Sequence, residues 1–145
     1  MTQSHDRQLD NFYQYVLDAA KLRTIKHAKV WTEGTLEILG TVLDRRVRRV
    51  LSKNLPEELT DSLGGIFWLL HFRDTNMSAE DFCQRVARRS GNSDPEYARV
   101  PVGAVFGGLR LYIGPDLEKR IVDSLPPEIG AIWVNGQTEE ITLAR

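Results

Sequence analysis

A seventy-residue internal repeat, marked by a Leu-Pro pair, constrains the fold more than any other feature of this sequence. Leu55 and Pro56 open the pentapeptide LPEEL, and Leu125 and Pro126 open LPPEI seventy positions later. With the same shift and no gap, identical residues pair elsewhere: Phe12 with Phe82, Gln14 with Gln84, Val16 with Val86, Ala28 with Ala98, Val30 with Val100 and Leu39 with Leu109. One structural unit is therefore written twice in the chain.

Apolar residues at three- and four-residue steps predict two helices at the start of the first unit. Residues 9–22 form the first, with Asp6 as its cap, and the second begins at Thr24. The inner stripe of the second helix is Ala28, Trp31, Thr35, Ile38, Leu39 and Val42. This helix contains no proline or other local stop, so its end must be predicted from the repeat.

The repeat places a break at Asp44. Asp44 aligns with Gly114, which precedes Pro115; glycine closes helices and proline opens them. Asp44 then caps a third helix over residues 45–53, which turns its arginines outward and buries Val47, Val50 and Leu51.

The Leu-Pro pair opens a short fourth helix in each unit. Proline pushes the preceding residue out of helical geometry, so Leu55 and Leu125 should be extended and plug the core. Pro56 and Pro126 then start the helix, where a missing N–H is harmless, and the glutamates that follow favour the positive end of the helix dipole.

The second unit has clearer boundaries. Ser78 predicts a helix start, residues 91–93 an end, and residues 94–96, Asp-Pro-Glu, another start. Pro101 predicts a kinked or split helix, and the glycines after it allow another backbone to come close; they are Gly103, Gly107 and Gly108. Beyond Asn135 we expect a loose or weakly docked tail, with a hairpin as the alternative.

These patterns predict an all-α domain of about eight helices. Two tandem four-helix repeats, residues 9–73 and 74–134, are related by a pseudo-twofold and share one core, with the apolar stretch 63–70 as the buried joint between them. Residues 1–8 form a flexible N-terminus and residues 135–145 a C-terminal tail.

Composition excludes several classes of protein. A net charge of −1 argues against a whole surface built for nucleic acid or anionic lipid, so such a partner needs a local patch. The single cysteine, Cys83, excludes an internal disulfide and a cysteine zinc cluster. We see no signal peptide or membrane span and expect a cytoplasmic protein.

One local basic patch is present: Arg45, Arg46, Arg48, Arg49 and Lys53, with no acid between them. In a helix, residues 46, 49 and 53 share one strip and residues 45 and 48 a neighbouring one. The second unit lacks the patch, so the scaffold does not require it. Three interpretations stay open: a solvated or salt-bridged face, a surface for a protein partner, or a nucleic-acid surface. A smaller basic face, Arg85, Arg88 and Arg89, is interpreted as solvated.

Catalytic signals are absent from the sequence. We find no nucleophile elbow, no acid–base pair and no histidine pair at ligand spacing, and predict no catalytic residue, metal or cofactor. The segment 103–108 is glycine-rich but lacks the Lys-Ser/Thr of a phosphate loop. If a pocket exists, Trp68 and His71 are its best candidates.

The order of motifs resembles that of the bacterial domain-of-unknown-function family numbered 2267. The resemblance is carried by Phe then Val on a first helix, an alanine-bearing second helix, a third helix and the Leu-Pro pair, over residues 9–133. It implies a small, internally duplicated, all-helical protein and contributes no catalytic residue.

We therefore expect a non-enzymatic interaction or regulatory module with a protein partner, and self-association. The alternative is a nucleic-acid-associated protein that uses residues 45–53. A third hypothesis is a ligand carrier or enzyme with a pocket near Trp68 and His71.

Overall fold

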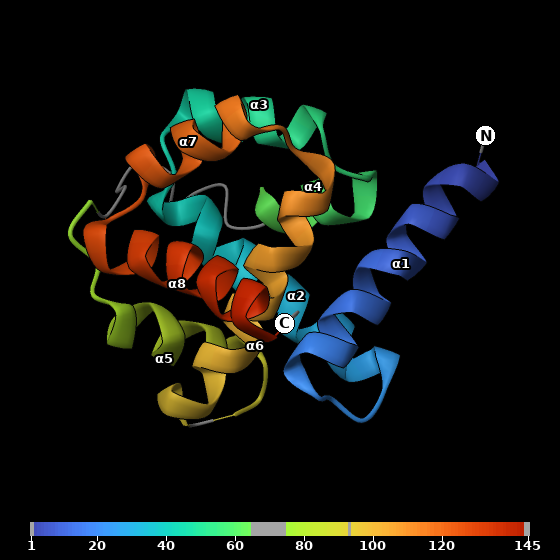
Figure 1. Cartoon of the computed structure of the whole chain (residues 1–145), viewed down its shortest axis with the longest axis horizontal. Helices are drawn as coiled ribbons and strands as arrows, with labels where there is room; N and C mark the ends of the chain where they lie inside the picture. The colour runs from blue at the N-terminus through green and yellow to red at the C-terminus, as the bar shows by residue number, and fades with distance from the viewer. Residues whose placement is uncertain (1, 65–74, 93, 144–145) are drawn as a thin grey trace.

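The computed structural model describes residues 2–64, 75–92 and 94–143, all of whose regular structure is helical (Figure 1). The elements are α1 (Thr2–Ala20), α2 (Ile25–Val42), α3 (Arg45–Lys53), α4 (Glu57–Leu63), α5 (Ala79–Arg89), α6 (Pro95–Leu109), the 3₁₀-helix η2 (Arg110–Tyr112), α7 (Pro115–Ser124) and α8 (Pro127–Leu143). The predicted all-α class is confirmed.

Side-chain caps fix four of the helix starts. Thr24, Asp44, Ser78 and Asp94 each precede a helix, and the side-chain oxygen of each accepts a backbone N–H from the first turn at 3.0–3.2 Å. Such a bond satisfies one of the amides that a helix start leaves unpaired. Helix α2 ends at Val42 and α3 begins at Arg45, so the predicted break at Asp44 is confirmed.

Corresponding helices begin seventy residues apart. Ile25 and Pro95 open α2 and α6, Arg45 and Pro115 open α3 and α7, and Glu57 and Pro127 open α4 and α8. Helices α2 and α6 lie at the centre and contact each other. Around them, α1 and α5 each contact both central helices, α4 packs on α2, α8 packs on α6, and α3 lies beside α7 (Figure 1).

A single apolar core joins these helices. Phe12 of α1 and Phe82 of α5 are fully buried, as are Leu39 of α2 and Leu109 of α6. Leu55 and Leu125, just before the prolines of the Leu-Pro pairs, are also buried, and so are Pro56 and Pro126. The same cluster includes Trp31 and Trp133.

Both ends of the chain are more helical than predicted. Helix α1 begins at Thr2 instead of residue 9, and Asp6 lies inside it instead of capping it. No proline or glycine interrupts residues 2–8, so the backbone hydrogen bonds continue toward the N-terminus. Helix α8 runs to Leu143, so the tail predicted to be loose or weakly docked beyond Asn135 is helical, and the alternative of a hairpin is wrong. The two interior glycines of α8, Gly130 and Gly136, each weaken a helix by only about 1 kcal/mol and do not end it.

Two expectations about α6 need correction: the split at Pro101, which was predicted as an alternative to a kink, and the close approach of another backbone at the glycines. The helix is not split at Pro101 but continues from Pro95 to Leu109, because packing against four neighbouring helices outweighs one lost N–H bond. Another backbone does not pack closely against Gly107 or Gly108 of α6. A Cβ on Gly107 would meet the Tyr15 hydroxyl, and one on Gly108 would meet the Phe12 ring, so both glycines make room for aromatic side chains of α1.

Candidate interaction surface on helix α3

Helix α3 is amphipathic and buries only its apolar face. Val47 and Leu51 enter the core, whereas Val50 is only half-buried. A period of 3.6 residues places Arg49 opposite Val47 and Leu51, directed at solvent. The exposed cations on this outer face are Arg45, Arg46, Arg49 and Lys53, which we call the α3 cation face.

Arg48 does not belong to this face, contrary to the prediction that all the arginines turn outward. Its side chain is half-buried, and its guanidinium donates to the Gly40 carbonyl of α2 at 3.3 Å. A Cβ on Gly40 would collide with the Leu63 carbonyl at the end of α4, so glycine allows close approach of α2 and α4 there. Arg48 therefore ties α3 to this junction.

Within the described residues, no side chain of the α3 cation face forms an ion pair. Within the described part of the chain, an ion pair joins Arg89 of α5 to Glu37 of α2 at 3.4 Å, and it involves no residue of α3. The first turn of α3 contains no acid, whereas that of α7 contains Asp116 and Glu118. Burial, and then the like charges of Arg45 and Arg49, lower the pKa of Arg48. The arginines thus repel one another, and Arg45 and Arg46 in the first turn also lie at the positive end of the helix dipole.

The two helices that pack against α3 both expose acids. Helix α3 packs on α4, which exposes Glu57 and Asp61, and on α7, which exposes Asp116 and Asp123. The backbone N–H of Asp44, the α3 cap, donates to the Ser124 hydroxyl at 2.8 Å, so the start of α3 meets the end of α7. None of the three helices contains an aromatic residue or histidine. Helix α7 also exposes the cations Lys119 and Arg120, so α3 differs from its neighbours in exposing cations without acids among them.

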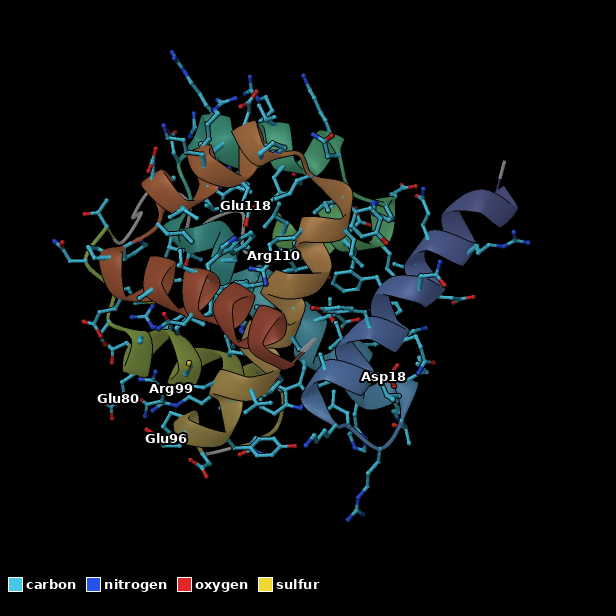
Figure 2. All side chains as sticks on the ribbon, viewed as in Figure 1. Asp18, Glu80, Glu96, Arg99, Arg110 and Glu118 are labelled. Atoms are coloured by element: carbon cyan, nitrogen blue, oxygen red, sulfur yellow. The ribbon has the colours of Figure 1, made fainter. Side chains whose placement is uncertain are left out.

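A polar cluster in the second half was missed by the sequence analysis. Trp133 donates its indole N–H to Glu118 at 3.0 Å, and Arg110 donates to the Trp133 carbonyl at 2.9 Å while its guanidinium lies 5.8 Å from the indole centroid. Figure 2 labels Arg110 and Glu118, the two charged residues of this cluster. Seventy residues earlier stand Leu63, Arg48 and Gly40, the junction described above. The one signal in the sequence that could have indicated this cluster is the change from Arg48 to Glu118 at equivalent positions of the repeat.

A second missed contact lies between α1 and α4. The buried Tyr13 hydroxyl donates to Glu58 at 2.6 Å. Burial and then the hydrogen bond to Glu58 strongly raise the pKa of Tyr13. Seventy residues later, Glu128 accepts the backbone N–H of Ala79 at 3.2 Å. Both glutamates thus attach a fourth helix to a first helix, through different donors.

The remaining predicted sites give no assembled centre. Trp68 and His71, the candidate pocket residues, lie in residues 65–74, outside the described residues. Among the residues that are described, no three metal-ligating side chains come together. Arg85 and Arg88 are exposed on α5, and Arg89 forms the ion pair with Glu37.

Comparison with known protein families identifies the family to which the chain belongs. The model of the uncharacterized conserved protein family DUF2267 matches residues 9–137, most of the chain. The chain belongs to this family. The resemblance inferred from the Leu-Pro pairs is confirmed, and the family's description assigns no function to its members. No curated protein matches the chain.

In the part of the chain that is described, no helix combines the length and apolar character that crossing a membrane requires.

Proposed function

We propose that this protein is a non-enzymatic interaction module built from two tandem four-helix repeats, residues 9–73 and 74–134, about an approximate twofold axis. The seventy-residue spacing of the helix starts supports this proposal. Equivalent packing supports it too: α1 contacts α2 and α6 as α5 contacts α6 and α2, and α4 packs on α2 as α8 packs on α6. The pairs α2–α6 and α3–α7 lie across the proposed axis.

The α3 cation face is the proposed binding surface. The observation that carries this assignment is the placement of Arg45 and Arg46 in the first turn of α3, where the helix dipole disfavours cations. The corresponding turn of α7 has Asp116 and Glu118 and folds with the favourable charge. These arginines therefore do not stabilise the folded state, and binding to an acidic partner would explain why they are present.

Affinity capture with a matched control tests the assignment. Arg45→Glu with Arg49→Glu reverses two charges on the α3 cation face, and Arg85→Glu with Arg88→Glu makes the same charge change on α5. The proposal is supported if wild type and the α5 variant capture the same partners and the α3 variant does not. Equal capture by all three proteins contradicts it.

Nucleic acid is the second candidate partner, because exposed arginines on adjacent lines of a helix can neutralise phosphates. Binding to duplex DNA or RNA would weaken steeply with salt and disappear in the Arg45→Glu, Arg49→Glu variant. Absence of salt-sensitive binding would exclude this candidate.

Self-association is part of the proposal. Exposed apolar side chains support it, among them Tyr97 and Val100 on α6 and Leu111 in η2. Light scattering coupled to size exclusion tests it, and a monomer at every concentration would contradict it.

A further inference from the structure

We infer that the α3 cation face binds an acidic helix of a partner protein, whose carboxylates recur once per turn. This inference rests on the proposed function and specifies the partner's chemistry. Arg45, Arg49 and Lys53 follow one another at four-residue steps, so their backbone positions rise by about 6 Å each. A helix with acids four residues apart has the same spacing.

The composition of the face suits carboxylates. Three of its four cations are arginines, whose planar guanidinium groups can donate two parallel hydrogen bonds to one carboxylate. Within the described residues, no acid of this chain pairs with Arg45, Arg46 or Arg49. The donors of these side chains can therefore turn toward an incoming acid.

The exposed acids on the helices beside the face favour a single helix over a nucleic acid as its partner. Both helices that pack against α3 expose acids: Glu57 and Asp61 on α4, and Asp116 and Asp123 on α7, which also exposes Lys119 and Arg120. A duplex is broader than one helix and would bring phosphates over these carboxylates, which repel them. A single strand would find no aromatic residue on α3, α4 or α7 for base stacking.

The backbone of α3 favours a helical over an extended partner. The interior amides and carbonyls of α3 are engaged within the helix, and the described part of the chain offers no strand edge. An extended segment lying along α3 would leave its own backbone groups to water, whereas a helix satisfies them internally.

Titration with defined probes tests the inference. The main probe is a capped, labelled alanine-rich peptide with glutamate at every fourth position; the others are the same peptide with glutamine and a labelled random-sequence DNA duplex. Fluorescence anisotropy at low salt should show that full-length wild type binds the glutamate peptide. Arg45→Glu with Arg49→Glu should weaken this binding by about tenfold or more, and Arg85→Glu with Arg88→Glu by less than about twofold.

Other outcomes overturn the inference in distinguishable ways. Tighter binding of the duplex than of the glutamate peptide, lost in the α3 variant, would identify a phosphate surface and leave the proposed binding role intact. No binding of the glutamate peptide, or equal binding of the glutamine peptide, would exclude an acidic helix as the partner. If the double variant fails to fold, Arg49→Gln removes one exposed charge and should still weaken binding by about threefold.

Discussion

Helices α3 and α7 begin seventy residues apart, lie side by side and differ mainly on their outer surfaces. Both bury a residue at the corresponding core position, Leu51 in α3 and Ile121 in α7. Outside, α3 carries four exposed cations, whereas α7 mixes Asp116 and Asp123 with Lys119 and Arg120. The fold requires the buried apolar residues that the two helices share, because packing constrains them. It does not require the exposed positive charge of α3, which must have another origin.

The largest expected effect concerns the interior that the two halves share. Phe12→Ala and Phe82→Ala each remove a fully buried ring, and each should lower the free energy of unfolding by about 3–5 kcal/mol. Because Phe12 of α1 packs against Gly108 of α6, its loss should destabilise both proposed repeats together. Urea unfolding followed by tryptophan fluorescence and far-ultraviolet circular dichroism should give coincident transitions; separate transitions would indicate independent halves.

Tyr13 and Cys83, buried at corresponding positions, make the interior sensitive to alkaline pH. Burial raises the pKa of Cys83 from 9.0 to about 11, so the unfolded chain releases this proton first. The contribution of the buried thiol to the free energy of unfolding, roughly 3 kcal/mol, is fully present below pH 9.0 and is lost as pH rises toward about 11. Cys83→Ala should flatten this part of the stability profile, as measured by urea unfolding at several pH values. An unchanged profile would contradict the assignment to Cys83.

Two glycines in the central helices should respond oppositely to alanine. Gly40→Ala brings a Cβ against the Leu63 carbonyl and should lower the free energy of unfolding by about 1–2 kcal/mol. Gly103→Ala meets nothing within 4 Å and should raise it by about 0.5–1 kcal/mol, because alanine is the better helix former. Thermal unfolding of the pair distinguishes them, and equal shifts would show that α2 and α4 do not approach closely at Gly40.

Local signals in the sequence were sufficient to predict most helix boundaries. Asp44, Ser78 and Asp94 cap the helices that they were predicted to cap, because a short acceptor side chain acts on amides only two or three residues away. The end of α2 needed the repeat, since nothing between Thr24 and Asp44 stops a helix. The full extent of α1 and α8 was missed because continuation of a helix gives no positive signal.

Contacts between distant segments were beyond prediction from the sequence. The inward turn of Arg48 depends on a carbonyl of α2, and the Trp133–Glu118 hydrogen bond depends on how α7 and α8 pack. Periodicity identified which residues share a face of one helix. It could not show which neighbouring helix that face contacts. Of the five cations predicted to point outward, therefore, only four are exposed.

The smallest expected effect tests the central claim most directly. Arg45→Glu places an acid at the start of α3, where α7 already has acids, and also forms a favourable pair with Arg49 four residues later. If the α3 cation face serves binding and not folding, urea unfolding should show a free energy of unfolding about 0.3–1 kcal/mol higher than that of wild type. Asp116→Arg in α7 should lower it by a similar amount. A clear loss of stability in Arg45→Glu would show that the fold itself requires the cation.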